Sequence, residues 1–225
     1  MLESYAWQDQ RLPFYHFSQL ASTNNTAWEL HQQGTPPPFA VISDRQTAGK
    51  GQWGRHWESQ RGGLYLSLLL ASEISLSQPS HLTISSVFGV TELLSCYQIP
   101  VQIKWLNDIF LQGKKLGGVL IETQVQRGRF KAVVIGIGVN WSNVVPDRGI
   151  ALKDYLEQRS LQPKLHPSSF LLNTALKPFS LPPTLASLAD LTYIVLAGLL
   201  LGYHCYLQKG ITALIPYYEA RLIKE

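Results

Sequence analysis

Three runs of β-favouring residues lie close together in the sequence, at Ile109–Leu111, Val119–Gln126 and Phe130–Asn140. The short intervals between them contain Gln112-Gly113 and Arg127-Gly128, which favour tight turns. Runs so close together can only fold back on one another as consecutive antiparallel hairpins. Because helical patterns occur elsewhere without a regular βαβ rhythm, the sequence predicts an α+β fold.

The remaining elements up to residue 141 follow from hydrophobic spacing and from breaker residues. Gly34 and three prolines end the first helix, and Pro100 separates the second helix from the strand that follows it. We expect helices at Ser22–Gln33 and Ser80–Tyr97, with strands at Phe39–Ser43, Leu64–Leu70 and Val101–Trp105.

We expect a single domain over 1–225, with its core at 14–141, an irregular excursion at 142–184 and C-terminal helices at 185–225. Those helices are expected at Leu185–Gln208 and Thr212–Leu222. The first contains an uncharged run, Leu191–Gln208, which is nearly long enough to span a membrane. His204, two glycines and three tyrosines dilute this run, so we interpret it as a buried core helix.

Composition narrows the classes of partner. Charged residues make up only 15% of the chain and the net charge is +4, without any continuous basic tract. Small anionic ligands fit this distribution better than DNA or RNA does. Cys96 and Cys205 lie far apart, and the N-terminus lacks the pattern of a signal peptide, so we expect a cytoplasmic protein with no membrane anchor.

Asp44–Gly63 is a long segment without periodicity, of the kind often kept for function. Its Gly49–Gly54 part matches G-x-G-x-x-G, yet no helix follows, which argues against a dinucleotide-binding fold; a Walker A loop is absent too. Flexible backbone, four cations and two tryptophans suit a flap over a phosphate-bearing ligand. A solvated basic turn is the plainer alternative.

Two further clusters are polar. Lys104–Asp108, followed by Lys114–Gly118, combines lysines, a carboxylate and glycines at a strand end, which can bind a phosphate and magnesium together, although such a pair is often only a turn. Ser22–Asn25 begins a helix, and capping explains only one of its four polar residues. The others suit a neutral ligand group such as an amide or urea, and Gly136–Asn140 permits close approach.

Taken in order, Ser22-Thr23-Asn24, Gln46 with GKGQWGRHW, KWLND with KKLGG, and GIGVN resemble the biotin–protein ligase family over about residues 14–141. The resemblance implies a mixed β-sheet flanked by helices, distantly similar to class II aminoacyl-tRNA synthetases. It also implies ATP-dependent attachment of biotin, through biotinyl-5′-AMP, to a lysine of the biotin carboxyl carrier protein of acetyl-CoA carboxylase.

By the same resemblance, Lys115, Asp108 and Arg55 are the expected catalytic residues. ATP and Mg²⁺ are expected cofactors, with the metal near Asn107 and Asp108. The residues expected to bind biotin or the adenylate are Ser22, Thr23, Asn24, Gln46, Gly49, Lys50, Gly51, Gln52, Trp57, Lys104, Asn107, Gly117, Gly118, Gly138 and Asn140.

The chain departs from the family pattern at three positions, because Lys50 and Gln52 replace common arginines and Leu106 replaces a common proline. With 21 residues before Ser22, we expect no helix-turn-helix domain and no DNA binding. The small C-terminal barrel is expected to be missing, and the oligomeric state stays open, with a homodimer as one option. A lipoate ligase or octanoyl transferase, and a biotin sensor without turnover, remain the alternatives.

Overall fold

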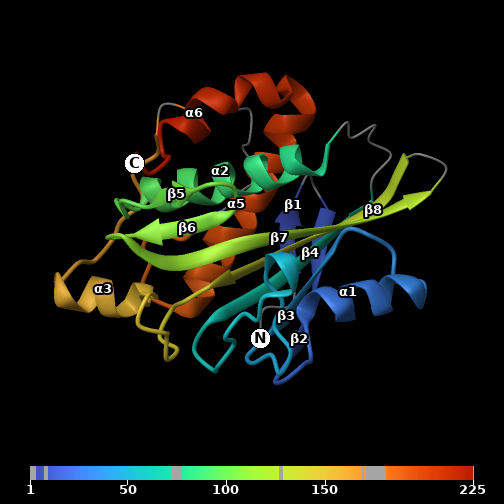
Figure 1. Ribbon diagram of the computed structural model, residues 1–225, viewed down its shortest axis with the longest axis horizontal. Coiled ribbons are helices and arrows are strands. Elements are labelled where there is room, and N and C mark those ends of the chain that lie inside the picture. Colours follow the sequence, from blue (N-terminus) through green and yellow to red (C-terminus); the bar gives the residue numbers. More distant parts are fainter. Residues whose placement is uncertain are drawn as a thin grey trace.

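The computed structural model describes residues 4–7, 10–71, 78–126, 129–168, 170 and 181–224. One eight-stranded sheet runs through it in the order β1-β2-β3-β4-β8-β7-β6-β5. Only the β2–β3 pair is parallel among the paired strands described, so the sheet is mixed. The expected α+β class and mixed sheet are confirmed (Figure 1).

The longest strands, β7 and β8, lie in the interior of the sheet, and the shortest, β5, lies at one edge. The bounds of the strands are β1 Ser4–Trp7, β2 Gln10–Phe17, β3 Phe39–Ser43, β4 Leu64–Ala71, β5 Gln102–Lys104, β6 Asp108–Leu111, β7 Lys114–Gln126 and β8 Arg129–Val139. The helices are α1 Thr23–Gln32, α2 Pro79–Cys96, α3 Leu152–Gln158, α5 Leu188–Lys209 and α6 Ile215–Glu219, with 3-10 turns η1 Gln52–Gly54 and η2 Ile211–Ala213.

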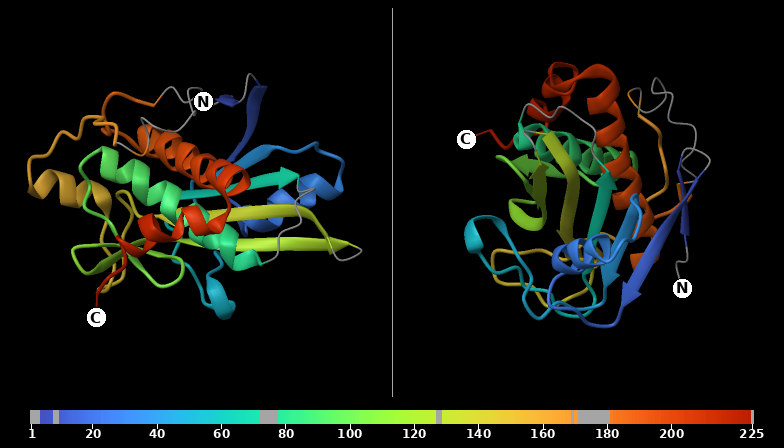
Figure 2. Two further views of the ribbon diagram at one scale, coloured as in Figure 1. Left: turned by 90° about the horizontal axis from the view of Figure 1, so that it is seen from above. Right: turned by 90° about the vertical axis from the view of Figure 1, so that its right-hand side faces the viewer.

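Side chains alternate across the central strands and so divide the sheet into two faces. The even-numbered leucines of β4 and the odd-numbered residues of β8 from Val133 to Val139 face the large core beneath α2 and α5. Leu69 and Val134 face the opposite side, where Ala27 of α1 packs on them. Figure 2 shows α2 and α5 side by side over one face and α1 against the other. Because α1 is short, part of that second face stays open.

The helices α2 and α5 touch through glycines. A Cβ atom on Gly202 would lie 1.9 Å from the Ser85 carbonyl oxygen, and one on Gly89 would lie 2.0 Å from that of Gly198. Within the described residues, α5 is the one helix long and apolar enough to cross a membrane, and 72% of its most apolar window is buried. The helix therefore packs as part of the core, as its composition predicts.

Several expected bounds differ from the structure. The N-terminal strands β1 and β2 were not predicted, and Lys114 begins β7 instead of preceding a strand. The expected helix Thr212–Leu222 is divided into η2 and α6, because Pro216 fits only in the first turn of a helix. The long helix begins at Leu188, where Ser187 and Asp190 form a capping box. The predicted turn Arg127-Gly128 and part of the 142–184 excursion lie outside the described residues, and α3 lies within that excursion.

Candidate functional site

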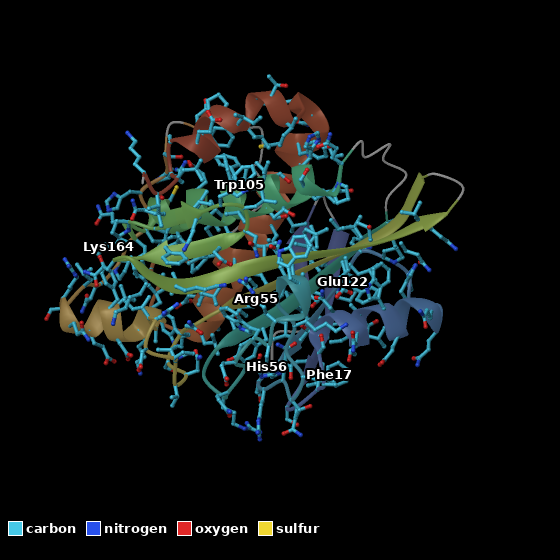
Figure 3. The ribbon with its side chains drawn as sticks, in the orientation of Figure 1. Phe17, Arg55, His56, Trp105, Glu122 and Lys164 are labelled. Carbon is cyan, nitrogen blue, oxygen red and sulfur yellow. The ribbon has the colours of Figure 1, made fainter. Side chains whose placement is uncertain are left out.

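A cavity of about 320 Å³ opens on the uncovered face of the sheet. Its floor is formed by β7 and β8, one end by the start of α1, and its cover by the loop from Lys50 to Trp57. The size is that of a small-molecule site. In Figure 3 the labelled side chains of Arg55, His56 and Glu122 gather on one side of the long strands, and Trp105 lies on the hairpin beyond β7.

The inner end of the cavity is neutral and polar. Gln46 Oε1 accepts hydrogen bonds from the backbone N–H of Thr23 at 2.8 Å and from its hydroxyl at 3.1 Å. Ser67 Oγ lies 2.8 Å from Thr23 Oγ1 and 2.6 Å from Asn24 Oδ1. With its oxygen held in this way, Asn24 leaves its buried Nδ2 without a partner among the described residues. Because buried donors are normally hydrogen-bonded, an acceptor on a ligand would satisfy this amide.

Two glycines of β8 allow this arrangement, because they face the cavity on the same side as Ser67. A Cβ atom on Gly136 would lie 2.2 Å from Asn24 Oδ1, and one on Gly138 would lie 2.4 Å from Trp57 Nε1. The indole N–H of Trp57 is the second buried donor in the cavity wall that lacks a partner among the described residues. Both side chains thus lie directly against glycine backbone in the cavity wall, and each carries a donor without a partner among the described residues.

The middle of the cavity carries an ion pair. Lys115 Nζ lies 2.7 Å from Asp108 Oδ1 and 5.3 Å from the centre of the Trp57 ring. Both charged side chains are about two-thirds or more buried, so water screens the pair only in part. The ammonium group therefore lies beside Trp57, a residue of the loop. Nearby, Asn107 Nδ2 donates to the Val119 carbonyl at 2.9 Å and so fixes the turn before Asp108.

The loop is held over the cavity by bonds of its own. Gly51 N–H donates to the Arg55 carbonyl at 2.7 Å, and Trp57 N–H donates to the Gly49 carbonyl at 3.0 Å. At its base the Tyr65 hydroxyl donates to the Gln60 carbonyl at 2.6 Å, and burial raises the pKa of this tyrosine well above its usual value. Lys50 extends away from Lys115, with its Nζ 2.6 Å from Asn25 Oδ1 and 3.8 Å from Glu122.

Most of the residues expected at the site line this cavity, with three exceptions. The expected residues that do line the cavity are Ser22, Thr23, Asn24, Gln46, Lys50, Gly51, Gln52, Arg55, Trp57, Lys104, Asn107, Asp108, Lys115, Gly118 and Gly138. Gly49, Gly117 and Asn140 lie behind the wall. Gly49 carries the base of the loop, Gly117 lets two strands approach, and the Asn140 amide lies 3.4 Å from the Lys115 carbonyl oxygen.

Trp53, His56, Trp105, Gly136 and Ile137 also line the cavity; they belong to the predicted clusters but were not named singly as site residues. Val119 and Leu120 line it without having been predicted. Ser67 and Glu122 were missed too, although each bonds to a lining residue. Ser67 could have been found, because a serine in the leucine-rich run of β4 marks the face that is not core. Glu122 gave no such signal, since alternating polar residues are ordinary in an antiparallel strand.

No group of three or more His, Cys, Asp or Glu side chains that could hold a metal ion occurs in the part of the chain that the structure describes. Among the described residues, Asp108 is the one carboxylate that lines the cavity, and it already pairs with Lys115. The described residues therefore do not build a complete metal cage.

The model of the biotin/lipoate A/B protein ligase family matches residues 16–140. This range includes the neutral inner end of the cavity, the ion pair in its middle and the loop that covers it. The chain belongs to the biotin/lipoate A/B protein ligase family. The match covers more than half of the chain, and it spans the helix start, the loop and the hairpin strands that carry the ligase-like motifs.

Among curated relatives, the bifunctional ligase/repressor BirA of Bacillus spizizenii is 39% identical over 137 residues, or 60% of this chain and 42% of the relative. The biotin–[acetyl-CoA-carboxylase] ligase of Paracoccus denitrificans is 31% identical over 57% of this chain and 54% of that protein. The chain thus spans about half the length of these relatives or less.

Among solved structures, the biotin protein ligase of Aquifex aeolicus in complex with biotin and ATP superposes with a TM-score of 0.69 at 24% identity. The superposition covers 93% of this chain and 78% of the Aquifex chain. At this identity the likeness establishes the ligase fold for nearly the whole chain.

Proposed function

We propose that this protein is a biotin–protein ligase that activates biotin with ATP as biotinyl-5′-AMP and transfers the biotinyl group to a lysine of a carrier domain. The observation that carries the proposal is the two-ended cavity. An inner end, where Asn24 Nδ2 has no partner among the described residues, adjoins the Lys115 ammonium in the middle, under a glycine-rich loop. A biotin-like molecule has the matching order of groups, a neutral urea at one end and a carboxylate at the other.

The inner end selects the acyl group. Asn24 Nδ2 would donate to the urea oxygen, while Ser22, Thr23 and Gln46 surround the same space with hydroxyl and amide groups. A lipoyl or octanoyl chain offers no hydrogen-bonding group there, so burying it would leave this amide unsatisfied at a cost of about 1–3 kcal/mol. The residues present therefore favour biotin over the other acids handled within the family.

The middle of the cavity supports the adenylation step. A carboxylate oxygen of biotin attacks the α-phosphorus of ATP, the bond to the bridging oxygen breaks, and pyrophosphate leaves with the electron pair. Negative charge gathers on the α-phosphoryl oxygens, where Lys115 and Arg55 would stabilise it. Asp108 keeps the ammonium of Lys115 in place beforehand. Lys104 and Gln52, at the rim, would contact the nucleotide.

The loop and the hairpin support the transfer step. The loop from Lys50 to Trp57 excludes water from the mixed anhydride until the acceptor arrives. The acceptor amine then attacks the acyl carbon, AMP leaves with the bonding electrons, and the amine loses a proton to give an amide. Asp108, which lines the cavity, would accept that proton. The proposed acceptor is the biotin carboxyl carrier protein of acetyl-CoA carboxylase.

Magnesium enters the proposal with ATP. Such ions usually bind through one or two carboxylates together with substrate phosphates, and Asp108 is the carboxylate that the cavity offers. When bound, the ion would neutralise phosphate charge. The side chain of Asn107 is turned to the backbone of β7, so its part is to hold the turn. A cytoplasmic location is also part of the proposal, supported by the two free, buried cysteines, Cys96 and Cys205.

The test has two stages. Isotope exchange of pyrophosphate into ATP is measured with biotin and with lipoate, and then a carrier domain is added and scored for covalent biotin. Biotin-dependent exchange followed by labelling supports the proposal. Exchange with lipoate alone would identify the lipoate branch of the family, and biotin binding without exchange would identify a sensor.

A further inference from the structure

The segment from Tyr218 to Ile223, here called the C-terminal strap, lies against the outer side of the hairpin formed by β5 and β6. The N–H of Ile103 donates to the Arg221 carbonyl at 2.8 Å, and Ile223 N–H donates to the Ile103 carbonyl at 2.9 Å. These bonds add the strap to the edge of the sheet. Nothing in the sequence patterns connects this segment to the site, because more than 100 residues separate them.

The strap is fixed to the core by a buried ion pair. Arg221 pairs with Glu92 of α2, which is 1% exposed and also accepts a hydrogen bond from Ser168. The guanidinium carbon lies 5.9 Å from the centre of the Phe88 ring. Since a buried charge is held firmly only when it is paired, this contact gives the strap a rigid anchor and not a loose tail.

Tyr218 links this anchored strap to the cavity. Its hydroxyl donates to the Leu106 carbonyl at 2.8 Å, and its ring meets that of Trp105 edge-on at 6.1 Å between centroids. The residue is 1% exposed, and burial raises the pKa of its hydroxyl above the usual value, so the group stays protonated and donates. Tyr218 therefore holds the turn between Lys104 and Asp108 in place.

The opposite side of that turn is held by β7, through the bond from Asn107 Nδ2 to the Val119 carbonyl. The turn is thus clamped between α6 and β7, and the next residue is Asp108, which pairs with Lys115. Releasing one side of the clamp would let Asp108 shift against the ammonium group. A shift of about 1 Å matters at such a position, because reacting groups must be held close to their productive geometry.

We propose that Tyr218 is a positioning residue for adenylation, acting through the Leu106 carbonyl on the Asp108–Lys115 pair. The inference rests on the proposed function and assigns the C-terminal strap a part in it. Because the neutral end of the cavity is built from α1, β4 and β8, the strap should affect turnover and leave biotin binding unchanged. This separation between kcat and KM distinguishes positioning from a general loss of structure.

The test compares Tyr218→Phe, which keeps the ring and removes the hydroxyl, with Tyr217→Phe. Tyr217 is its neighbour on α6, and its ring packs against Phe88 and Phe170 instead of the hairpin. Biotin-binding sites are counted by titration, and biotin-dependent pyrophosphate exchange is expressed per site. Hydrogen exchange is followed by mass spectrometry in peptides that cover residues 102–111.

For Tyr218→Phe we expect exchange turnover per site to fall by about 3- to 10-fold, the value of one hydrogen bond, with the KM for biotin unchanged. Hydrogen exchange in 102–111 should become faster, and Tyr217→Phe should show neither effect. Unchanged turnover per site, or unchanged hydrogen exchange at the hairpin, would overturn the inference. If the unmutated chain makes no adenylate, the proposed function is wrong. The positioning role of Tyr218 in adenylation is then wrong too, even if the hairpin still loosens in Tyr218→Phe.

Discussion

Lys115 and Asp108 form an ion pair of 2.7 Å at the point where β6 and β7 meet beneath the glycine-rich loop. The two residues lie on strands joined by a tight turn, yet their side chains reach the same cavity as the start of α1. This meeting point lets a cation, an acid and a neutral binding end act on one ligand.

Replacing Lys115 with alanine should lower adenylate formation by at least about 100-fold, because a charge-stabilising group of this kind contributes about 10²–10³ in rate. The fold should be retained, since the side chain is one-third exposed and loses only one ion pair. The measurement is biotin-dependent pyrophosphate exchange, with thermal melting as the check on folding. Lys114→Ala serves as the control, because Lys114 is exposed and does not line the cavity. Near-normal exchange in Lys115→Ala would remove this residue from the mechanism.

Gly136→Ala should weaken biotin binding, because the added methyl group would lie 2.2 Å from Asn24 Oδ1 and would push that amide from its place. We expect the KM for biotin to rise by about 5- to 150-fold, as for the loss of about 1–3 kcal/mol of hydrogen bonding. Gly113→Ala is the control. Its turn has a φ of 73° and open space around it, so it should lose stability without any change in KM. Equal changes in KM for both variants would contradict the assignment of the neutral end.

Glu122→Gln should loosen the loop in the absence of ligand. Glu122 lies 3.8 Å from Lys50 and accepts a hydrogen bond from Trp28 at 2.8 Å, and the amide keeps an acceptor for the indole while losing the charge. A partly exposed ion pair contributes about 0.2–1 kcal/mol, so trypsin should cleave after Lys50 or Arg55 only about 1.5- to 5-fold faster. The matched control is Glu157→Gln, which breaks the exposed ion pair with Lys153 on α3. Identical cleavage rates for the two variants would show that the Lys50–Glu122 ion pair does not hold the loop.

The sequence predicts most of this architecture, because alternation and helical spacing are local signals. The helix that starts at Thr23, the strand Phe39–Ser43 and the long helix α2 lie within a residue or two of their expected bounds. Strands β1 and β2 were missed, since their five aromatic residues stand among polar residues and a proline without a clear period. Gly113 marks the turn before β7. Lys114 and Lys115 lie in a segment whose sequence looks like a turn, but they are the first two residues of β7.

The sequence predicts those cavity residues that lie in short motifs. It does not predict the contacts between segments far apart in the sequence. Ser22 to Asn24, Lys115 and the loop are visible as clusters in the sequence. Glu122 and Tyr218 are not visible in this way, because their roles depend on distant contacts. Glu122 contacts Lys50, which is 72 positions away, and Tyr218 contacts Leu106, which is 112 positions away. Lys50 shows the same limit, since its ammonium lies against Asn25 and Glu122 in this structure. Side-chain direction on a flexible loop does not follow from spacing.

Gly202→Ala tests whether α5 belongs to the core. Its Cβ atom would lie 1.9 Å from the Ser85 carbonyl oxygen, a backbone atom that can move only if α2 and α5 separate. Overpacking of this kind costs about 1–3 kcal/mol, which corresponds to a fall in Tm of about 2–4 °C for each kcal/mol in a chain of this size. Leu207→Ala, on the same helix but 46% exposed, should change Tm much less. Melting curves of the two purified variants decide the matter, and an unchanged Tm for Gly202→Ala would mean that α5 does not pack on α2 as described.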